Sequence, residues 1–265
     1  MLLVLAGCEG TTSVSVGVSG VVGGQPAACG TTYAGIGTTA SDFELADFRL
    51  YVHDVRLLTV GGEEVPVTLT DDGIFQRDGV AHLDFEDGSA GCENGNAEMN
   101  GAIAGTIEGE GPFDGIRFRL GVPFDLNHGD VSTSAPPLDR PGMFWNWNGG
   151  YKFLRVDGRT TGQPGGVQYH IGSTGCDGDG RGNVSGCAAD NRPEVELTGA
   201  DPTTTRIVVD VAALLSQSDV DGNLGGPPGC MSGVDDMDCV AVFHGLGLTY
   251  DGVAPTSPQR LFRFE

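Results

Sequence analysis

Basic residues are scarce in this chain of 265 residues. Its 14 lysines and arginines stand against 36 acidic residues, which gives a formal net charge of −22. A nucleic-acid-binding surface needs concentrated positive charge to neutralise phosphates. The composition therefore argues against DNA and RNA as partners, and it is compatible with cation binding without demonstrating it.

Several functional motifs are also missing. The sequence has no Gly-x-Ser-x-Gly nucleophile elbow and no phosphate-cradling glycine loop followed by a helix. No stretch after the N-terminus approaches the ~20 apolar residues that a membrane-spanning helix requires. These absences predict a protein that is not an enzyme and that contacts a membrane only through a lipid.

A lipid is indicated by the N-terminal segment. Leu5-Ala6-Gly7-Cys8 ends an apolar run and resembles the lipobox of bacterial lipoproteins, in which the cysteine is acylated and the preceding residues are removed. We interpret residues 1–7 as a partial lipoprotein signal, Cys8 as the lipidation site and residues 8–40 as a flexible tether rich in Gly, Ser and Thr. A weak first strand within residues 9–28 is the alternative for that part of the tether. The expected location is the cell envelope, on the periplasmic face of the outer membrane, because Glu9 does not suggest inner-membrane retention.

Six cysteines follow Cys8, and an even number in an exported protein suggests disulfides. Six cysteines allow 15 pairings. The simplest local pairs are Cys176–Cys187 and Cys230–Cys239, since each closes a loop rich in Gly and Asp, and Cys29 would then pair with Cys92. A zinc site is the alternative, although no CxxC pair is present.

The remaining pattern predicts strands. Residues 115–122 alternate between apolar and polar side chains, as a half-buried strand does. Residues 241–250 are among the further strand candidates, and residues 210–216 predict one short helix with Asp210 as its cap. With 45 glycines and 14 prolines dividing the chain, we expect an all-β, β-sandwich-like single domain over residues 41–265. Its long Gly- and Asp-rich loops would be closed by disulfides, and it would contain little helix.

Three histidines and two tryptophans are candidates for metal chemistry. His53 lies in a predicted strand beside Asp54, His170 ends another strand, and His128 lies in a loop. Two or three imidazoles brought together suit copper or zinc. Both tryptophans, Trp145 and Trp147, fall in one short segment beside a methionine, which is typical of an aromatic core cluster or of a redox-exposed or metal-facing patch.

Two acidic loops are candidates for calcium. Asp219, Asp221 and Asn223 place oxygens at alternate positions, so a tight turn could direct them at one ion. The segment 177–183 has a similar spacing, but Arg181 occupies a position where a ligand would be useful. Neither loop matches the full EF-hand pattern, and solvated turns are the alternative.

Taken together, these segments resemble one known family. The chain is similar to the metallo-mystery pair system four-Cys motif proteins, which are related to the methanobactin-associated periplasmic protein MbnP. The likeness rests on residues 48–57, 83–88 with Cys92, 121–128, 143–147 with 150–153, 170–176, and 227–233 with Cys239.

The resemblance implies a copper-binding protein of the cell envelope that serves copper acquisition or storage. It also implies a dihaem partner similar to bacterial cytochrome c peroxidases (MbnH-like), which oxidises a tryptophan to kynurenine near the copper. By carry-over, His53, His128 and His170 are the candidate ligands, of which strand placement and the neighbouring motif favour His53 and His170. Trp145 or Trp147 is the candidate oxidised residue. The competing hypothesis is a calcium-stabilised structural β-sandwich of the envelope without a copper function.

Overall fold

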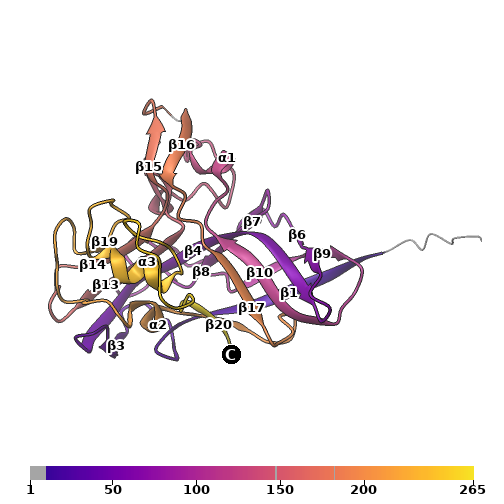
Figure 1. The fold of residues 1–265 in the computed structure, drawn as a ribbon, viewed down its shortest axis with the longest axis horizontal. Coiled ribbons are helices and arrows are strands. Elements are labelled where there is room, and N and C mark those ends of the chain that lie inside the picture. The colour runs from indigo at the N-terminus through magenta and orange to yellow at the C-terminus, as the bar shows by residue number, and fades with distance from the viewer. Residues whose placement is uncertain (1–9, 147, 182) are drawn as a thin grey trace, which may run out of the picture.

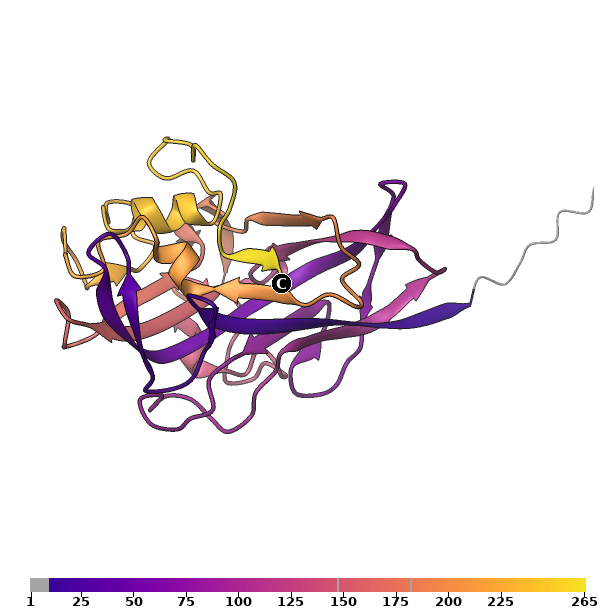
Figure 2. The same cartoon turned by 90° about the horizontal axis from the view of Figure 1, so that it is seen from below.

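The computed structural model describes residues 10–146, 148–181 and 183–265. Two large sheets pack on one another, and the predicted all-β, sandwich-like fold is confirmed (Figures 1 and 2). Two short helices, α2 and α3, lie at one end of the molecule, and a two-stranded hairpin projects from it beside α1 (Figure 1). No helix in the described part of the chain is long and apolar enough to cross a membrane.

The first sheet is built around the long N-terminal strand β1. Its strand order is β20 (Phe262–Phe264), β18 (Ile207–Asp210), β1 (Thr11–Val22), β9 (Ala102–Glu108) and β6 (Thr68–Leu69), with β2 (Gln25–Pro26) also paired to β1.

The second sheet is built around the 19-residue strand β4. Its order is β17 (Glu194–Thr198), β10 (Phe113–Leu120), β4 (Ser41–Thr59), β13 (Leu154–Thr160), β14 (Val167–Ile171) and β19 (Gly229–Cys230). Strands β3 (Thr32–Ile36), β5 (Glu64–Pro66) and β8 (Val80–Asp84) also pair with β4, and β7 (Gln76–Arg77) pairs with β8.

Short elements complete the fold. They are the hairpins β11 (Phe144–Asn146) with β12 (Gly150–Tyr151) and β15 (Thr174–Gly178) with β16 (Val184–Ala189), the helices α1 (Phe124–Asn127), α2 (Val211–Leu215) and α3 (Cys239–Gly245), and a 3-10 helix, η1 (Pro141–Met143).

Apolar side chains fill the space between the two sheets. The rings of Phe48 and Phe85 lie 4.9 Å apart, and a Cβ atom on Gly20 of β1 would lie 2.5 Å from the Phe85 ring. Only a glycine at this position lets β1 approach so closely. Phe118 of β10 and Phe262 of β20 bridge the sheets in the same way, with ring centroids 5.0 Å apart. Phe48 of β4 points into this core. Side chains alternate along a strand, so its neighbours Asp47 and Arg49 point to the opposite face of the second sheet.

The prediction of a flexible tether before residue 41 is wrong for residues 11–36, which contain strands β1, β2 and β3. Strand β1 pairs in parallel with β18 and antiparallel with β9, and β3 pairs with β4. Val16 and Val18 are buried while Ser13 and Ser15 are exposed, which is the alternation of a half-buried strand. Small polar residues and partners distant in sequence hid this pattern. The predicted signal and Cys8 lie outside the described residues.

Local capping and loop closure were predicted more successfully. Asp210 caps α2 by accepting hydrogen bonds from the amides of Ala212 and Ala213, as expected. The strand predicted over residues 241–250 is wrong, because α3 occupies its first half. A short apolar run suits a buried helix as well as a strand, so the pattern could not separate them.

All three predicted disulfides are present, namely Cys29–Cys92, Cys176–Cys187 and Cys230–Cys239.

Candidate metal centre

The second sheet carries buried charge on the face that points away from the sandwich core. Arg49 of β4 lies opposite Asp84 of β8 on one side and Arg155 of β13 on the other, and Arg155 lies opposite His170 of β14. Directly opposed residues project to the same face, so these four side chains form a row across four strands. We refer to this row, with the adjacent Asp47, Glu86 and Asp157, as the charged cluster.

The segment after α1 covers the charged cluster. The hydroxyl of Tyr51 donates to the carbonyl of Pro137 at 2.9 Å, and the guanidinium of Arg155 donates to the carbonyl of Gly142 at 2.9 Å. The Lys152 ammonium donates to the same Gly142 carbonyl at 2.8 Å. Burial, followed by repulsion from Arg155, lowers the pKa of Lys152 to about 8. The covering segment thus excludes water from the cluster and brings Trp145 to its edge.

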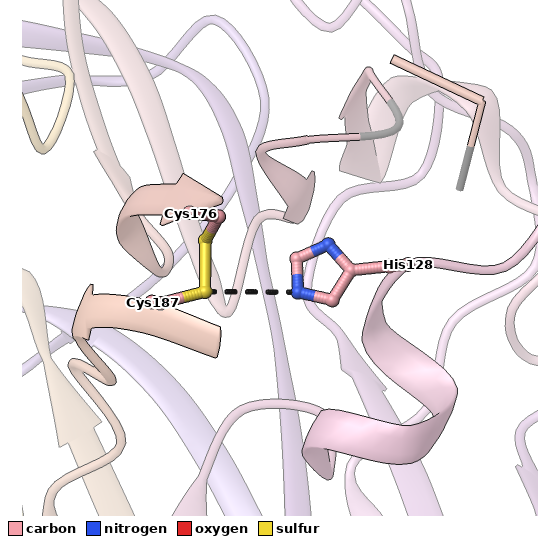
Figure 3. A group of neighbouring side chains, drawn as sticks. All are labelled: His128, Cys176 and Cys187. Carbon is pink, nitrogen blue, oxygen red and sulfur yellow. Dashed lines mark hydrogen bonds between the residues drawn. A yellow bond between two sulfur atoms is a disulfide. The ribbon is translucent and has the colours of Figure 1, made fainter. Parts of the chain in front are cut away.

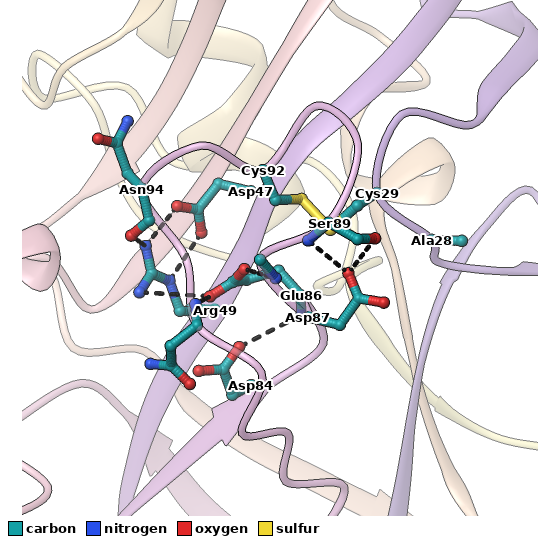
Figure 4. The surroundings of a disulfide bond; sticks show 12 residues. Ala28, Cys29, Asp47, Arg49, Asp84, Glu86, Asp87, Ser89, Cys92 and Asn94 are labelled. Carbon is teal, nitrogen blue, oxygen red and sulfur yellow. Dashed lines mark hydrogen bonds and ion pairs between the residues drawn. A yellow bond between two sulfur atoms is a disulfide. The ribbon is translucent and has the colours of Figure 1, made fainter.

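Ion pairs hold the cluster together. Arg49 binds Asp47 through two nitrogens and lies 3.6 Å from the carboxylate of Glu86 (Figure 4). Arg155 contacts Asp47 at 3.1 Å and Asp157 at 2.6 Å. Burial raises the pKa of Asp47, although the hydrogen bond and charge of Arg49 oppose this. The buried carboxylates of Asp47, Glu86 and Asp157 are therefore each paired with a guanidinium.

His170 is the histidine whose surroundings best fit a metal ligand. Its Nε2 atom lies 2.5 Å from Oδ1 of Asp157, and its Nδ1 atom is buried with no hydrogen-bond partner among the described residues. A carboxylate only accepts, so Nε2 carries the proton and the lone pair is on Nδ1. Burial lowers the pKa of His170 despite the opposing contact with Asp157, which favours the neutral ring.

Trp145 lies beside His170. The two ring centroids are 6.4 Å apart, and a Cβ atom on Gly172 would lie 2.4 Å from Cζ3 of Trp145. The absence of a side chain at Gly172 therefore lets the indole lie against the end of β14. Trp147 lies outside the described residues, so the structure places only one of the two candidate tryptophans.

His53 is not close to His170. It lies on the same face, but four residues further along β4 and two strands away. These offsets correspond to about 13 Å along the strand and about 10 Å across it. The Nδ1 atom of His53 instead lies 2.8 Å from the carbonyl oxygen of Gly121, and burial lowers the pKa of the ring. The structure therefore does not bring His53 and His170 together.

His128 lies beside a disulfide. Its Nε2 atom is 3.1 Å from Nδ2 of Asn127. The same Nε2 atom is 3.8 Å from Sγ of Cys187 (Figure 3). Within the described ranges, three potential metal-ligand atoms lie within 4.8 Å of one another here. They are one ring nitrogen of His128 and the sulfur atoms of Cys176 and Cys187. The structure thus separates the three predicted histidines among three surroundings.

Comparison with known proteins agrees with this fold. A sequence model of the MbnP family matches residues 11–232. The chain belongs to the MbnP family. The solved structure of MbnP from Methylosinus trichosporium superposes with a TM-score of 0.81 at 32% identity, covering 96% of this chain and 98% of that one. No curated protein matches the sequence.

The predicted calcium residues of this MbnP-family chain use their oxygens within the loop. Asp219 accepts hydrogen bonds from the amides of Asp221 and Gly222. Asp221 accepts from the hydroxyl of Ser41 and the amide of Gly162, and Asn223 accepts from the amide of Gly225. Side chains of this kind commonly stabilise turns. Calcium binding at this loop stays a prediction, as it does at residues 177–183.

Sequence reasoning missed His82 and Asp157. Asp157 could have been noticed because Asp47-x-Arg49 and Arg155-x-Asp157 both place opposite charges at alternate positions of a predicted strand. His82 has no comparable signal. It is fully buried against Tyr51, and both of its ring nitrogens lack hydrogen-bond partners within the described residues. Burial, with repulsion from Arg49 and Arg140, lowers its pKa well below the usual value.

Replacing His82 with phenylalanine should remove part of the loss of folding stability that the wild type suffers as the pH falls. The unfolded chain protonates His82 near pH 6.5 whereas the folded chain resists protonation, so the wild type loses stability as the pH falls below about 6.5. The variant should gain on the wild type by up to about 1.4 kcal/mol per pH unit in this window. Urea unfolding at pH 7.5, 6.5 and 5.5 measures this difference. A difference independent of pH would contradict the assignment.

The titration of Asp84, which lies beside His82, does not obscure this result. Its Oδ2 atom is 4.0 Å from Nδ1 of His82, and burial raises its pKa to about 7. A raised carboxyl pKa has the opposite effect, since its contribution to stability decreases as the pH rises toward 7. Asp84 is present in both proteins, so its contribution largely cancels when the two unfolding free energies are subtracted.

Proposed function

We propose that this chain is a copper-binding protein of the cell envelope, with His170 as a copper ligand beside Trp145. The observation that carries the proposal is the buried Nδ1 atom of His170, which has no partner among the described residues while Nε2 is held by Asp157. A neutral imidazole is a preferred copper ligand. Membership of the MbnP family supports the same metal.

Asp157 is the positioning residue of this proposed site. Metal-binding histidines usually donate their second ring N–H to a carboxylate or carbonyl, which fixes the tautomer and the ring orientation. Asp157 accepts from Nε2 in this way, and Arg155 holds Asp157 from the other side. The charged cluster therefore supports the ligand from within the sheet.

Trp145 is the proposed site of kynurenine formation by a dihaem partner similar to cytochrome c peroxidases. The indole nitrogen of tryptophan is a poor ligand, whereas kynurenine has an aryl amine and a carbonyl. Conversion of Trp145 would add these donor groups beside His170. The chain itself is proposed to be a non-enzymatic carrier or store of copper, anchored by a lipid on Cys8.

The test is peptide mapping by mass spectrometry of protein produced with and without the dihaem partner. We expect the tryptic peptide that contains both tryptophans to gain about 4 Da only with the partner, one carbon being lost and one oxygen gained. Trp145→Phe should abolish the gain and Trp147→Phe should retain it. A gain that follows Trp147, or no gain with the partner, would reject Trp145 as the modified residue.

A further inference from the structure

We propose that His128, Cys176 and Cys187 form a second copper site that exists only when the Cys176–Cys187 disulfide is reduced. The occupant is Cu(I), held by two thiolates and one imidazole. This site is built from different residues than the His170 and Trp145 site, and it does not rest on the function proposed above. The disulfide would act as the switch that opens and closes it.

The ligand atoms are already gathered. Within the described residues, the imidazole nitrogen and the two sulfur atoms lie within 4.8 Å of one another, and Nε2 of His128 is 3.8 Å from Sγ of Cys187 (Figure 3). In the oxidised protein the two sulfurs bond each other. Reduction replaces that bond with two soft donors that face the same imidazole, and thiolate donors select Cu(I).

The imidazole is oriented for this role by Asn127. Oδ1 of Asn127 accepts a hydrogen bond from the amide of Tyr151 at 2.9 Å, which fixes the orientation of the side-chain amide. Its Nδ2 atom is therefore the one 3.1 Å from Nε2 of His128, and it must donate. Nε2 is thus unprotonated, and its lone pair accepts this hydrogen bond while Sγ of Cys187 lies 3.8 Å from the same atom. A metal would take this lone pair in place of the N–H···N bond.

The hairpin keeps the two thiols adjacent without the disulfide. Cys176 and Cys187 are directly opposed in the β15–β16 ladder, between the pairs Thr174–Ala189 and Asp177–Gly186. The hydrogen bond from Asn148 to the carbonyl of Gly178 also ties this hairpin to the turn after β11. Reduction should therefore leave the side chains of Cys176 and Cys187 on one face of an intact ladder.

This disulfide is also the most accessible of the three. Cys176 and Cys187 are both half-buried, whereas Cys29 is half-buried but its partner Cys92 is 1% exposed, and Cys230 and Cys239 are fully buried. A protein dithiol of the envelope would supply the reducing electrons. One of its thiolates attacks a hairpin sulfur, and its second thiol resolves the mixed disulfide. Two electrons pass to the hairpin, which gains two thiols, and the donor leaves as a disulfide. Cu(I) binding then releases the thiol protons.

The experiment is an anaerobic Cu(I) titration against the chelator bathocuproine disulfonate. Wild-type protein is treated briefly with dithiothreitol, desalted, and compared with untreated protein, and alkylation with mass spectrometry verifies that Cys176 and Cys187 alone are reduced. We expect one more Cu(I) bound by the reduced protein, with sulfur and nitrogen neighbours in X-ray absorption. The Cys176→Ser, Cys187→Ser double variant should lose this extra ion.

Two further variants make the result specific. His128→Gln should lower the affinity for the extra Cu(I) at least about 10–100-fold. Replacing a residue that only orients a metal ligand already costs about that much. His170→Ala should keep the extra ion, which separates this site from the proposed His170 site. Circular dichroism confirms that each variant is folded. An unchanged Cu(I) count after verified reduction, or an unchanged affinity in His128→Gln, would overturn the proposal.

Discussion

Replacing Arg49 with methionine should lower the free energy of unfolding by about 3–5 kcal/mol, the usual cost of removing one partner from a buried ion pair. Methionine preserves most of the side-chain length, so packing changes little while the charge disappears. Arg49 is 3% exposed, and its loss leaves Asp47 and Glu86 buried without their main counter-charge (Figure 4). Urea unfolding at pH 7.5 measures the effect.

The pH dependence of the loss tests its electrostatic origin. Without Arg49, the pKa values of Asp47 and Glu86 in the folded protein should rise further above those of the unfolded chain. A raised carboxyl pKa costs stability increasingly as the pH rises above the unfolded value near 4. The difference between wild type and variant should therefore be larger at pH 7.5 than at pH 5.

Arg159→Met is the matched control. Arg159 lies on β13 and forms a 2.9 Å ion pair with Glu44 of β4, but its side chain is 43% exposed. Exposed pairs of this kind contribute about 0–1 kcal/mol. If Arg49→Met costs no more free energy of unfolding than Arg159→Met, the ion pairs of the charged cluster do not stabilise the sheet.

The sequence was sufficient to predict the class of fold and its covalent cross-links. Alternation of apolar and polar residues identified strands such as β10, and the short spacing of Cys176–Cys187 and Cys230–Cys239 identified their pairing. These signals are local, so a single chain reveals them. Residues 11–22 show the limit, because their paired residues in the two partner strands lie about 90 and 190 residues away in sequence.

The candidate site depends on contacts that no local pattern contains. His170 gained its partner because β13 pairs with β14 in a particular register, and Arg49 met Arg155 because β13 also pairs with β4. A shift of one residue would turn each side chain to the other face of the sheet. The sequence therefore identified His170 and Trp145 as candidates, but it could not show that they lie together or that His53 lies apart.

Replacing His170 with alanine should reduce copper affinity by at least about 100-fold, since residues that only orient a metal ligand are already worth 10–100-fold. The reason is the loss of the buried Nδ1 lone pair beside Trp145. Competition titration of the oxidised protein with a copper chelator measures this affinity. Asp157→Asn should show the smaller loss of about 10–100-fold expected of a positioning residue.

His244→Ala is the control for loss of an imidazole outside the charged cluster. Its Nε2 atom lies 3.1 Å from the carbonyl oxygen of Val253, outside the second sheet. This variant should bind copper like the wild type, as should His53→Ala if the separation along β4 keeps His53 from sharing the ion. Equal losses in the His53 and His170 variants would require the two strands to bring these rings together on one metal. Wild-type affinity in His170→Ala would remove His170 from the copper site.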